Sequence, residues 1–278
     1  MTQTQEDKNA YEIRNADYSI VHNDSDEDFL EFITALSIKQ ADKVIDIGGG
    51  YGSIFIRLIE HQPDLIIDYD LLDGGLFQLK KGEERINKLL IKHNNRSTVR
   101  YMHQDATMLD LEPDQYDLVI CKMFLHEIPI QHKKKIFKNL FDITKPGSRI
   151  FFWNPDLTPN NYSFYTDVIK KKDELAGFQS MVENRHFLLN QDFYEFLAEA
   201  GFINANKLMT FDYHLDTKNR LHEEFHGDRS RLQEWNAYIL KIAAQLDLET
   251  TKQLNIQVSA DNVYINFKRG IFSAQKPG

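Results

Sequence analysis

The sequence predicts an α/β protein with a doubly wound, mainly parallel seven-stranded sheet and helical insertions. Two observations lead to this prediction. Short apolar segments of strand length alternate with amphipathic, helix-like segments over more than a hundred residues, the pattern of a parallel sheet with crossover helices. In addition, VIDIGGGYG at 44–52 places four glycines directly behind the first strand. Ligands of such sheets bind at the carboxyl ends of the strands.

The first half of the chain supplies the regular alternation. A helix with an acidic first turn is expected at 26–36, because apolar residues recur there at helical spacing. KVIDI at 43–47 reads as a buried strand. The elements expected after it are helix 52–61, strand 64–70, helix 75–93, strand 98–102, strand 116–123, helix 130–144 and strand 149–153.

The second half is less regular. Residues 155–189 contain several aromatics and no strand signal. Later elements are helix 191–202, strand 205–214, helix 228–246 capped by Asp228 or Ser230, and a last strand at 262–275 interrupted by Gly270. The predicted division is an N-terminal helical segment at 1–40 covering the site and one domain at 41–278, with a lid-like insertion at 155–189 and a helical insertion at 215–260.

The composition and charge of the chain limit the kinds of partner and the cellular setting that we expect. No apolar run approaches the roughly 20 residues of a membrane span, and the polar N-terminus is no signal peptide. The single cysteine, Cys121, fits strand packing in a reducing, cytoplasmic setting. A formal charge of -9 argues against nucleic acid and leaves a small-molecule substrate, with a homodimer open. The KKK runs at 133–135 and 170–172 are interpreted as solvated helix faces.

The glycine run points to one cofactor. A dinucleotide fingerprint would require glycine at position 53, which is serine here. The spacing of Asp46, Gly48, Gly50 and Gly52 instead resembles motif I of class I S-adenosylmethionine-dependent methyltransferases, and the resemblance runs from about residue 43 to 202. It implies a Rossmann-like methyltransferase fold that binds S-adenosyl-L-methionine. The glycines would then lie against the methionyl part, with Asp46 orienting the loop and the cofactor's ammonium group.

The same resemblance implies further cofactor contacts. We expect Asp70 at the end of the second strand to accept hydrogen bonds from the ribose hydroxyls, and Asp68 is the alternative. HQDAT at 103–107 follows the third strand, where Asp105 would accept from the adenine amino group beside Ala106.

The segment CKMFLHEIP at 121–129 resembles the K-x-x-L-H-D segment of plant-type small-molecule O-methyltransferases. That resemblance implies His126 as the general base, Glu127 as its assistant and Lys122 as a cofactor contact. Glu127 replaces an aspartate and Ile128 a tryptophan of that family. The alternative is a structural histidine, since other methyltransferases carry an L-H pair here.

Three residues fall where this fold places its substrate lid: Tyr162, Tyr165 and His186. The predicted reaction is methyl transfer to a small molecule, most simply to a hydroxyl oxygen. Alternatives are N-methylation, although the N-P-P-Y motif is missing after the fourth strand, and a protein that binds cofactor without transferring methyl. HEEFH at 222–226 matches a zinc-protease pattern. Its flanks are charged and Gly227 ends the helix, so a solvated helix face and no metal site are predicted.

Overall fold

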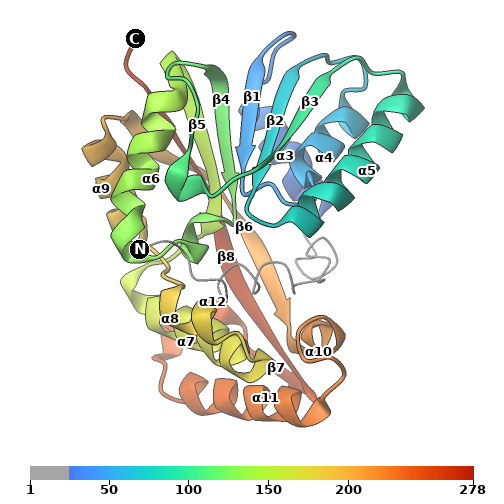
Figure 1. Ribbon diagram of the computed structural model, residues 1–278. Coiled ribbons are helices and arrows are strands. Elements are labelled where there is room, and N and C mark those ends of the chain that lie inside the picture. The colour runs from blue at the N-terminus through green and yellow to red at the C-terminus, as the bar shows by residue number, and fades with distance from the viewer. Residues whose placement is uncertain (1–24) are drawn as a thin grey trace.

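The computed structural model describes residues 25–278, and the first part of the predicted segment 1–40 lies outside them. A single mixed sheet organises the molecule (Figure 1), with strand order β3-β2-β1-β4-β5-β8-β6 and the short β7 paired to β8. Strands β1 to β5 pair in parallel, whereas β8 runs antiparallel to β5, β6 and β7. The predicted fold class is confirmed. The strands are β1 (Lys43–Ile47), β2 (Asp68–Asp73), β3 (Thr98–His103), β4 (Tyr116–Lys122), β5 (Thr144–Pro155), β6 (Ile203–Asp216), β7 (Gln257–Ser259) and β8 (Asn262–Gln275).

Helices cover both faces of the sheet because successive side chains of a buried strand point to opposite faces. In β4, Leu118 and Ile120 belong to one apolar cluster, while Val119 and Cys121 belong to the other. The first cluster includes α3 (Asp26–Leu36), α4 (Ser53–His61) and α5 (Leu76–His93), and the second includes α6 (Ile130–Ile143) and α9 (Asn190–Ala200). The continuous apolar runs of the sequence are thus strands buried on both faces.

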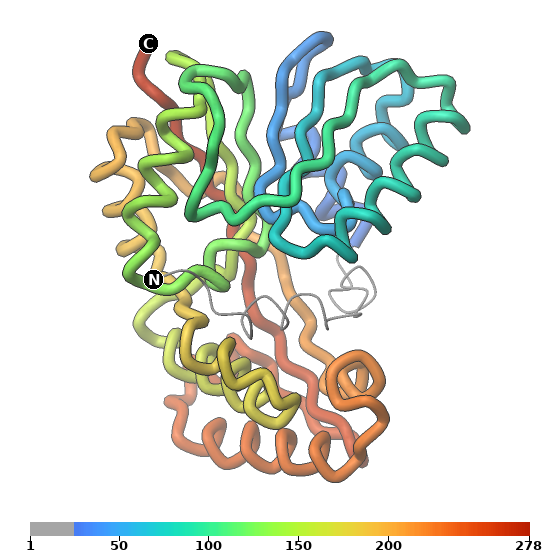
Figure 2. The backbone as a smooth tube through the Cα atoms, in the orientation of Figure 1, coloured from blue at the N-terminus to red at the C-terminus, as the bar shows by residue number. Residues whose placement is uncertain are grey.

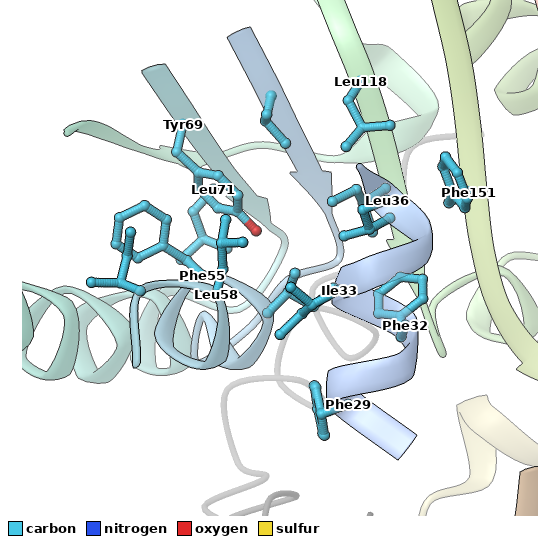
Figure 3. Packing of buried hydrophobic residues seen from close by; sticks show 14 of the residues in the cluster. Phe29, Phe32, Ile33, Leu36, Phe55, Leu58, Tyr69, Leu71, Leu118 and Phe151 are labelled. Atoms are coloured by element: carbon cyan, nitrogen blue, oxygen red, sulfur yellow. The ribbon is translucent and has the colours of Figure 1, made fainter. Parts of the chain in front are cut away.

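Helix α3 closes the first of these clusters. The Ser25 side chain caps it by accepting from the Asp28 amide, and its acidic first turn suits the helix dipole. Phe29 and Phe32 pack against the Trp153 ring at centroid distances of 5.2 and 5.1 Å. Figure 3 shows Leu36 of this helix facing Leu118 of β4, and Phe32 on the side of Phe151 of β5. Burial of this face fixes the start of α3, at Phe29, beside Trp153 and the end of β4 at Lys122.

A lower lobe extends from the sheet along the long antiparallel pair β6 and β8 (Figures 1 and 2). A third apolar cluster forms its core, and the indole N–H of Trp235 donates to the carbonyl of Val168 at 2.9 Å. Both predicted insertions, 155–189 and 215–260, contribute residues to this third cluster. That segment 155–189 acts as a lid stays a prediction. Its helices are α7 (Pro159–Ala176), α8 (Gln179–Asn184), α10 (Arg220–Glu223), α11 (Arg229–Ala243) and α12 (Leu248–Leu254).

Three local predictions were wrong. Strand β2 ends at Asp73 and not at Asp70, because its parallel register pairs Asp70 with Ile45 in the middle of β1. Strand β8 continues through Gly270, where a Cβ would lie 2.6 Å from the Phe272 ring, so the glycine serves close packing and not a break. Finally, Lys133 and Lys172 are buried within the two KKK runs. Among residues 25–278, no helix is long and apolar enough to span a membrane.

Candidate functional site

A cavity of about 700 Å³ opens at the carboxyl ends of β1, β2 and β4 and continues into the lower lobe. Its upper wall is the loop between β1 and α4 together with the ends of β2 and β4. Residues from α7, α10 and the segment after α8 line the other end. The cavity therefore has the position expected for a ligand site in an open α/β sheet.

The glycine loop is held against β2 by hydrogen bonds that its backbone amides donate. The amides of Gly48 and Gly49 both donate to the Leu72 carbonyl, at 2.8 and 3.2 Å, and the Gly50 amide donates to Asp73 Oδ2 at 2.9 Å. Gly50 has φ +51°, a left-handed conformation that favours glycine. A Cβ there would meet only Asp73 Oδ2, at 3.7 Å, so this side of the loop is open to a ligand.

Asp46 lies fully buried at the end of β1 and lines the cavity. Its Oδ2 accepts from the Tyr69 hydroxyl at 2.9 Å, while Oδ1 has no hydrogen-bond partner among the described residues. Burial raises the pKa of Asp46 to about 7, and the charge of Lys122 opposes that shift. The side chain offers a buried acceptor to a cationic or hydrogen-bonding ligand.

Asp73, which the sequence analysis did not select, is the cavity acid of β2. Besides the Gly50 amide it accepts from the Gly75 amide at 2.7 Å, through Oδ1. It lines the cavity, and burial raises its pKa to about 6. The signal for it was in the sequence, since an aspartate followed by two glycines marks the end of a strand more clearly than one followed by leucines.

Asp70 lies outside the residues that line the cavity. Its carboxylate accepts from Arg100 Nε at 2.9 Å and from the Tyr116 hydroxyl at 2.6 Å. Asp68 is exposed at the start of β2. The carboxylate of Asp70 therefore binds side chains of β3 and β4 and does not face the cavity.

The predicted adenine segment is a turn after β3. Asp105 Oδ1 accepts from the Thr107 amide at 2.8 Å and caps the short 3-10 helix η1 (Ala106–Met108). Ala106 is buried in the second apolar cluster. Neither residue is among those that line the cavity, and their adenine contact stays a prediction.

Lys122, the last residue of β4, lines the cavity together with His126 and Glu127 of the turn that follows. The Lys122 ammonium lies over the rings of Phe29 and Trp153, at 5.1 and 5.0 Å from their centroids. A 3-10 turn, η2 (Leu125–Glu127), allows the adjacent His126 and Glu127 to reach the same cavity, which a strand would not permit. The sequence reasoning thus placed these three residues at one site.

Two contacts hold this turn. The His126 ring stacks on Phe187 with centroids 5.1 Å apart and planes 16° from parallel. Behind it, the fully buried Lys133 Nζ donates to the Leu125 carbonyl at 2.6 Å. Burial lowers the pKa of Lys133 to about 7. Glu127 Oε1 lies 3.3 Å from Arg185 Nη2, so this carboxylate contacts a cation of the lower lobe.

The predicted substrate residues separate into two groups. Tyr165 is buried, lines the cavity and makes an edge contact with Phe187 at 5.0 Å. Tyr162 instead donates its hydroxyl to the Phe187 carbonyl at 3.3 Å, and the His186 amide donates to the His126 carbonyl at 2.9 Å. Neither of these two residues is among those lining the cavity. Both nevertheless fasten the segment that carries Phe187.

A buried ionic network at the lower-lobe end of the cavity escaped the sequence analysis. Its cations Lys172, Arg185 and Arg220 line the cavity, and Asp173 and Glu224 are its buried carboxylates. A signal existed for one member: Lys172 follows Val168 and Ile169 at helical spacing, which places it on the apolar face of α7. For the others, the tertiary contacts alone bring the charges together.

The HEEFH segment forms no continuous helix. Helix α10 ends at Glu223, and His226 takes a left-handed conformation with φ +52°. Both histidines are exposed, while Glu224 between them is buried in the ionic network. The expected solvated helix face is therefore wrong for Glu224, because it compensates buried cations. Within residues 25–278, no group of side chains could hold a metal ion.

The strand order, the glycine loop after β1 and the acid ending β2 define a class I S-adenosylmethionine-dependent methyltransferase. The chain belongs to the methyltransferase domain family, whose model matches residues 21–206. The cofactor of this class is S-adenosyl-L-methionine.

Curated relatives of the chain are named as methyltransferases. The chain is 23% identical over 185 residues to the mitochondrial 2-methoxy-6-polyprenyl-1,4-benzoquinol methylase of Caenorhabditis elegans, covering 63% of each protein. It is 28% identical over 121 residues to O-methyltransferase 12 of Dictyostelium discoideum, covering 43% of this chain and 30% of the relative. The match thus spans less than two thirds of each of these relatives.

Solved structures agree on the fold. A candidate methyltransferase from Bacillus halodurans matches with a TM-score of 0.69 at 17% identity, over 91% of this chain and all of the other. Phosphoethanolamine N-methyltransferase 2 of Haemonchus contortus, solved with phosphomonomethylethanolamine and S-adenosylhomocysteine, matches with a TM-score of 0.53 at 18% identity, over 100% of this chain and 58% of the other. At these identities the likeness concerns the fold.

Proposed function

We propose that the protein transfers the methyl group of S-adenosylmethionine to a hydroxyl oxygen of a small molecule. One observation carries this proposal: the glycine loop, the carboxylates of the buried Asp46 and the partly buried Asp73, and the imidazole of His126 line one cavity. The acids suit a cationic, ribose-bearing cofactor, and the imidazole suits removal of a hydroxyl proton.

The cofactor is proposed to bind across the ends of β1 and β2. Asp46 Oδ1 is the acceptor for its ammonium group, and the open side of Gly50 receives its methionyl part. Asp73 takes the ribose role that the sequence analysis gave to Asp70, because it lines the cavity and lies beside Gly50. A charged carboxylate accepts both ribose hydroxyls more strongly than a neutral group would.

Methyl transfer proceeds by in-line attack of the acceptor oxygen on the sulfonium methyl carbon. The carbon–sulfur bond breaks, and S-adenosylhomocysteine leaves with the bonding electron pair. His126 takes the hydroxyl proton as the oxygen attacks. The half-enclosed cavity between the sheet and the lower lobe keeps the two reactants in contact, and proximity and orientation supply much of the rate.

A nitrogen acceptor is the second candidate. The chain shares its fold with a phosphoethanolamine N-methyltransferase, and an amine with a free lone pair needs no base. To separate the candidates, the full chain is incubated with S-adenosylmethionine and a panel of hydroxybenzoates, quinols and small amines, and the products are identified by mass spectrometry. O-methylated products support the proposal. N-methylated products alone replace it with the second candidate, and cofactor binding without product indicates a protein that transfers no methyl.

Cofactor affinity is expected to fall as the pH decreases below about 7. Asp46 and Asp73 have pKa values raised to about 7 and about 6, and each must be ionised to hold the cationic cofactor. The loss approaches tenfold per pH unit below about 7 and grows once Asp73 is also protonated. Calorimetry between pH 5.5 and 8 measures it, and Asp46→Asn serves as the control that lacks the upper step. A pH-independent affinity in the wild type would contradict this cofactor placement.

The same pKa shifts make the folding stability of the protein without cofactor decrease as the pH rises, whereas they make the cofactor affinity increase. A carboxyl whose pKa is raised in the folded protein contributes stability below its ordinary pKa, and this contribution is lost as the pH rises through about 6 to 7. Bound cofactor neutralises the buried charges. The increase in melting temperature that the cofactor causes should therefore be larger at pH 8 than at pH 5.5.

A further inference from the structure

A lysine occupies a core position behind the turn that carries His126. Lys133 of α6 is fully buried, and Ile136 and Phe137 follow it as buried residues three and four positions later on the same helix. This spacing places Lys133 on the apolar stripe of α6. A lysine is almost never fully buried unless a contact compensates for the loss of water around its ammonium group.

The ammonium group of Lys133 contacts the backbone of this turn. Its Nζ donates to the carbonyl of Leu125, the residue immediately before His126, at 2.6 Å. The same carbonyl closes the turn by accepting from the Ile128 amide at 3.1 Å. A carbonyl oxygen has two lone pairs, so Lys133 takes the one that the turn itself leaves.

A second element holds the next carbonyl of the turn. The His186 amide donates to the His126 carbonyl at 2.9 Å. Two successive carbonyls of η2 are thus held by two different elements, α6 and the segment after α8. A short 3-10 turn has few hydrogen bonds of its own and poorer hydrogen-bond geometry than an α-helix, so these outside contacts set its orientation.

The orientation of the turn decides where the imidazole of His126 lies. Its ring stacks on Phe187, with centroids 5.1 Å apart and planes 16° from parallel, and Phe187 directly follows the residue that binds the His126 carbonyl. The ammonium group of Lys133 also acts on this segment, because burial lowers the pKa of His186 and the positive charge of Lys133 adds to that shift. A rotation of η2 would therefore break the Lys133 hydrogen bond and unstack the ring together.

We propose that Lys133 is a positioning residue for the general base: it holds the Leu125 carbonyl and thereby keeps the His126 imidazole in the orientation that takes the acceptor's proton. The inference rests on the proposed function, because His126 is the base of that reaction. Lys133 is not among the described residues that line the cavity, so it acts through the turn and not by contact with a reactant. Replacing a buried charge by an apolar side chain of similar shape is often neutral or stabilising, so folding stability alone does not require a lysine here.

Lys133→Met is expected to lower the turnover number by roughly 10- to 100-fold, since a misplacement of about 1 Å at the reacting groups has an effect of up to that size. Turnover and KM are measured on the hydroxybenzoate or quinol that the full chain methylates. The KM and the affinity for S-adenosylhomocysteine should stay close to the wild-type values, because the cavity wall is unchanged. Lys134→Met is the matched control, since Lys134 is the next residue of α6 but its exposed ammonium group pairs with Glu199. This control should keep wild-type turnover, and circular dichroism shows whether each variant is folded.

The NMR signal of the His126 ring gives a readout that needs no methyl transfer. Protons above an aromatic ring are shifted upfield by its ring current, so stacking on Phe187 marks the His126 signal. Histidine-labelled protein is compared with His126→Gln, which lacks the signal, and with Phe187→Leu, which gives its position without the ring current. In Lys133→Met the signal should move toward the Phe187→Leu position, whereas in Lys134→Met it should stay in place.

The two readouts separate this inference from the proposed function. An unmoved His126 signal in Lys133→Met would overturn the inference, as would wild-type turnover of that variant where His126→Gln is impaired. If His126→Gln itself keeps wild-type turnover, the proposed base is wrong, whereas a moved signal in Lys133→Met still shows that Lys133 holds the turn. Should Lys133→Met not fold, Lys133→Gln, which keeps a polar side chain but lacks the ammonium group, is measured in the same way.

Discussion

Replacing His126 by glutamine is expected to lower the turnover number by roughly 10²–10⁴, the usual cost of losing a general acid–base group. The affinity for S-adenosylmethionine should change little. The His126 imidazole stacks on Phe187 in the turn that follows β4, whereas the acids proposed to bind the cofactor lie at the ends of β1 and β2. Steady-state kinetics on an O-methylated acceptor and calorimetry with the cofactor measure the two quantities.

The size of this loss should depend on the acceptor. A phenol acidic enough to ionise without help needs no base, so the variant should lose less activity on it than on a weakly acidic hydroxyl. His186→Gln is the control, since the cavity-lining residues do not include His186, and its turnover should stay close to that of the wild type. Wild-type turnover in His126→Gln on a weakly acidic acceptor would show that the histidine is structural. A nitrogen acceptor would then be favoured.

Asp73→Ala is expected to weaken cofactor binding by roughly 10- to 150-fold, the range that corresponds to charge-assisted hydrogen bonds of about 1.5–3 kcal/mol. Two losses contribute to this effect: the proposed contacts with the ribose hydroxyls and the anchor that the carboxylate gives to the Gly50 and Gly75 amides. Calorimetric titration with S-adenosylhomocysteine measures the affinity. Circular dichroism and thermal denaturation show whether the variant remains folded.

Asp70→Ala is the matched comparison, because it changes the same residue type three positions earlier on the same strand. This variant should lose folding stability, since Arg100 and the Tyr116 hydroxyl both lose their partner, but it should keep its cofactor affinity. The reverse pattern, with Asp70→Ala losing affinity and Asp73→Ala retaining it, would restore the original assignment of the ribose contact to Asp70.

The choice between Asp70 and Asp73 could not be made from the sequence, because it depends on where β2 ends. A strand signal locates an apolar run, but both DLIIDYD and DYDLLD fit such a run, and no local property sets the last residue. Pairing with β1 and β3 decides it, because the register carries β2 on to Asp73, opposite His103. The carboxyl end of the strand, and with it the cavity acid, is a property of the sheet.

The sequence by itself determined the order of strands and helices and the position of the glycine loop. Alternating strands and helices indicated the doubly wound sheet, and the Asp46–Gly52 spacing located the loop that the structure places at the cavity. His126 and Glu127 were also selected from sequence, and both line the cavity. Apolar periodicity and glycine spacing are written in consecutive residues, so they can be read without a partner segment.

Only the tertiary structure decided which charges are buried and what they contact. Arg185 and Glu224 look like ordinary surface residues in the sequence, yet the fold brings them together with Lys172 at one end of the cavity. A charged side chain becomes a buried site residue when distant segments bring an opposite charge to it, since only that pairing offsets the loss of water. Such pairing is set by how the lower lobe packs on β6 and β8, and no short stretch of sequence records it.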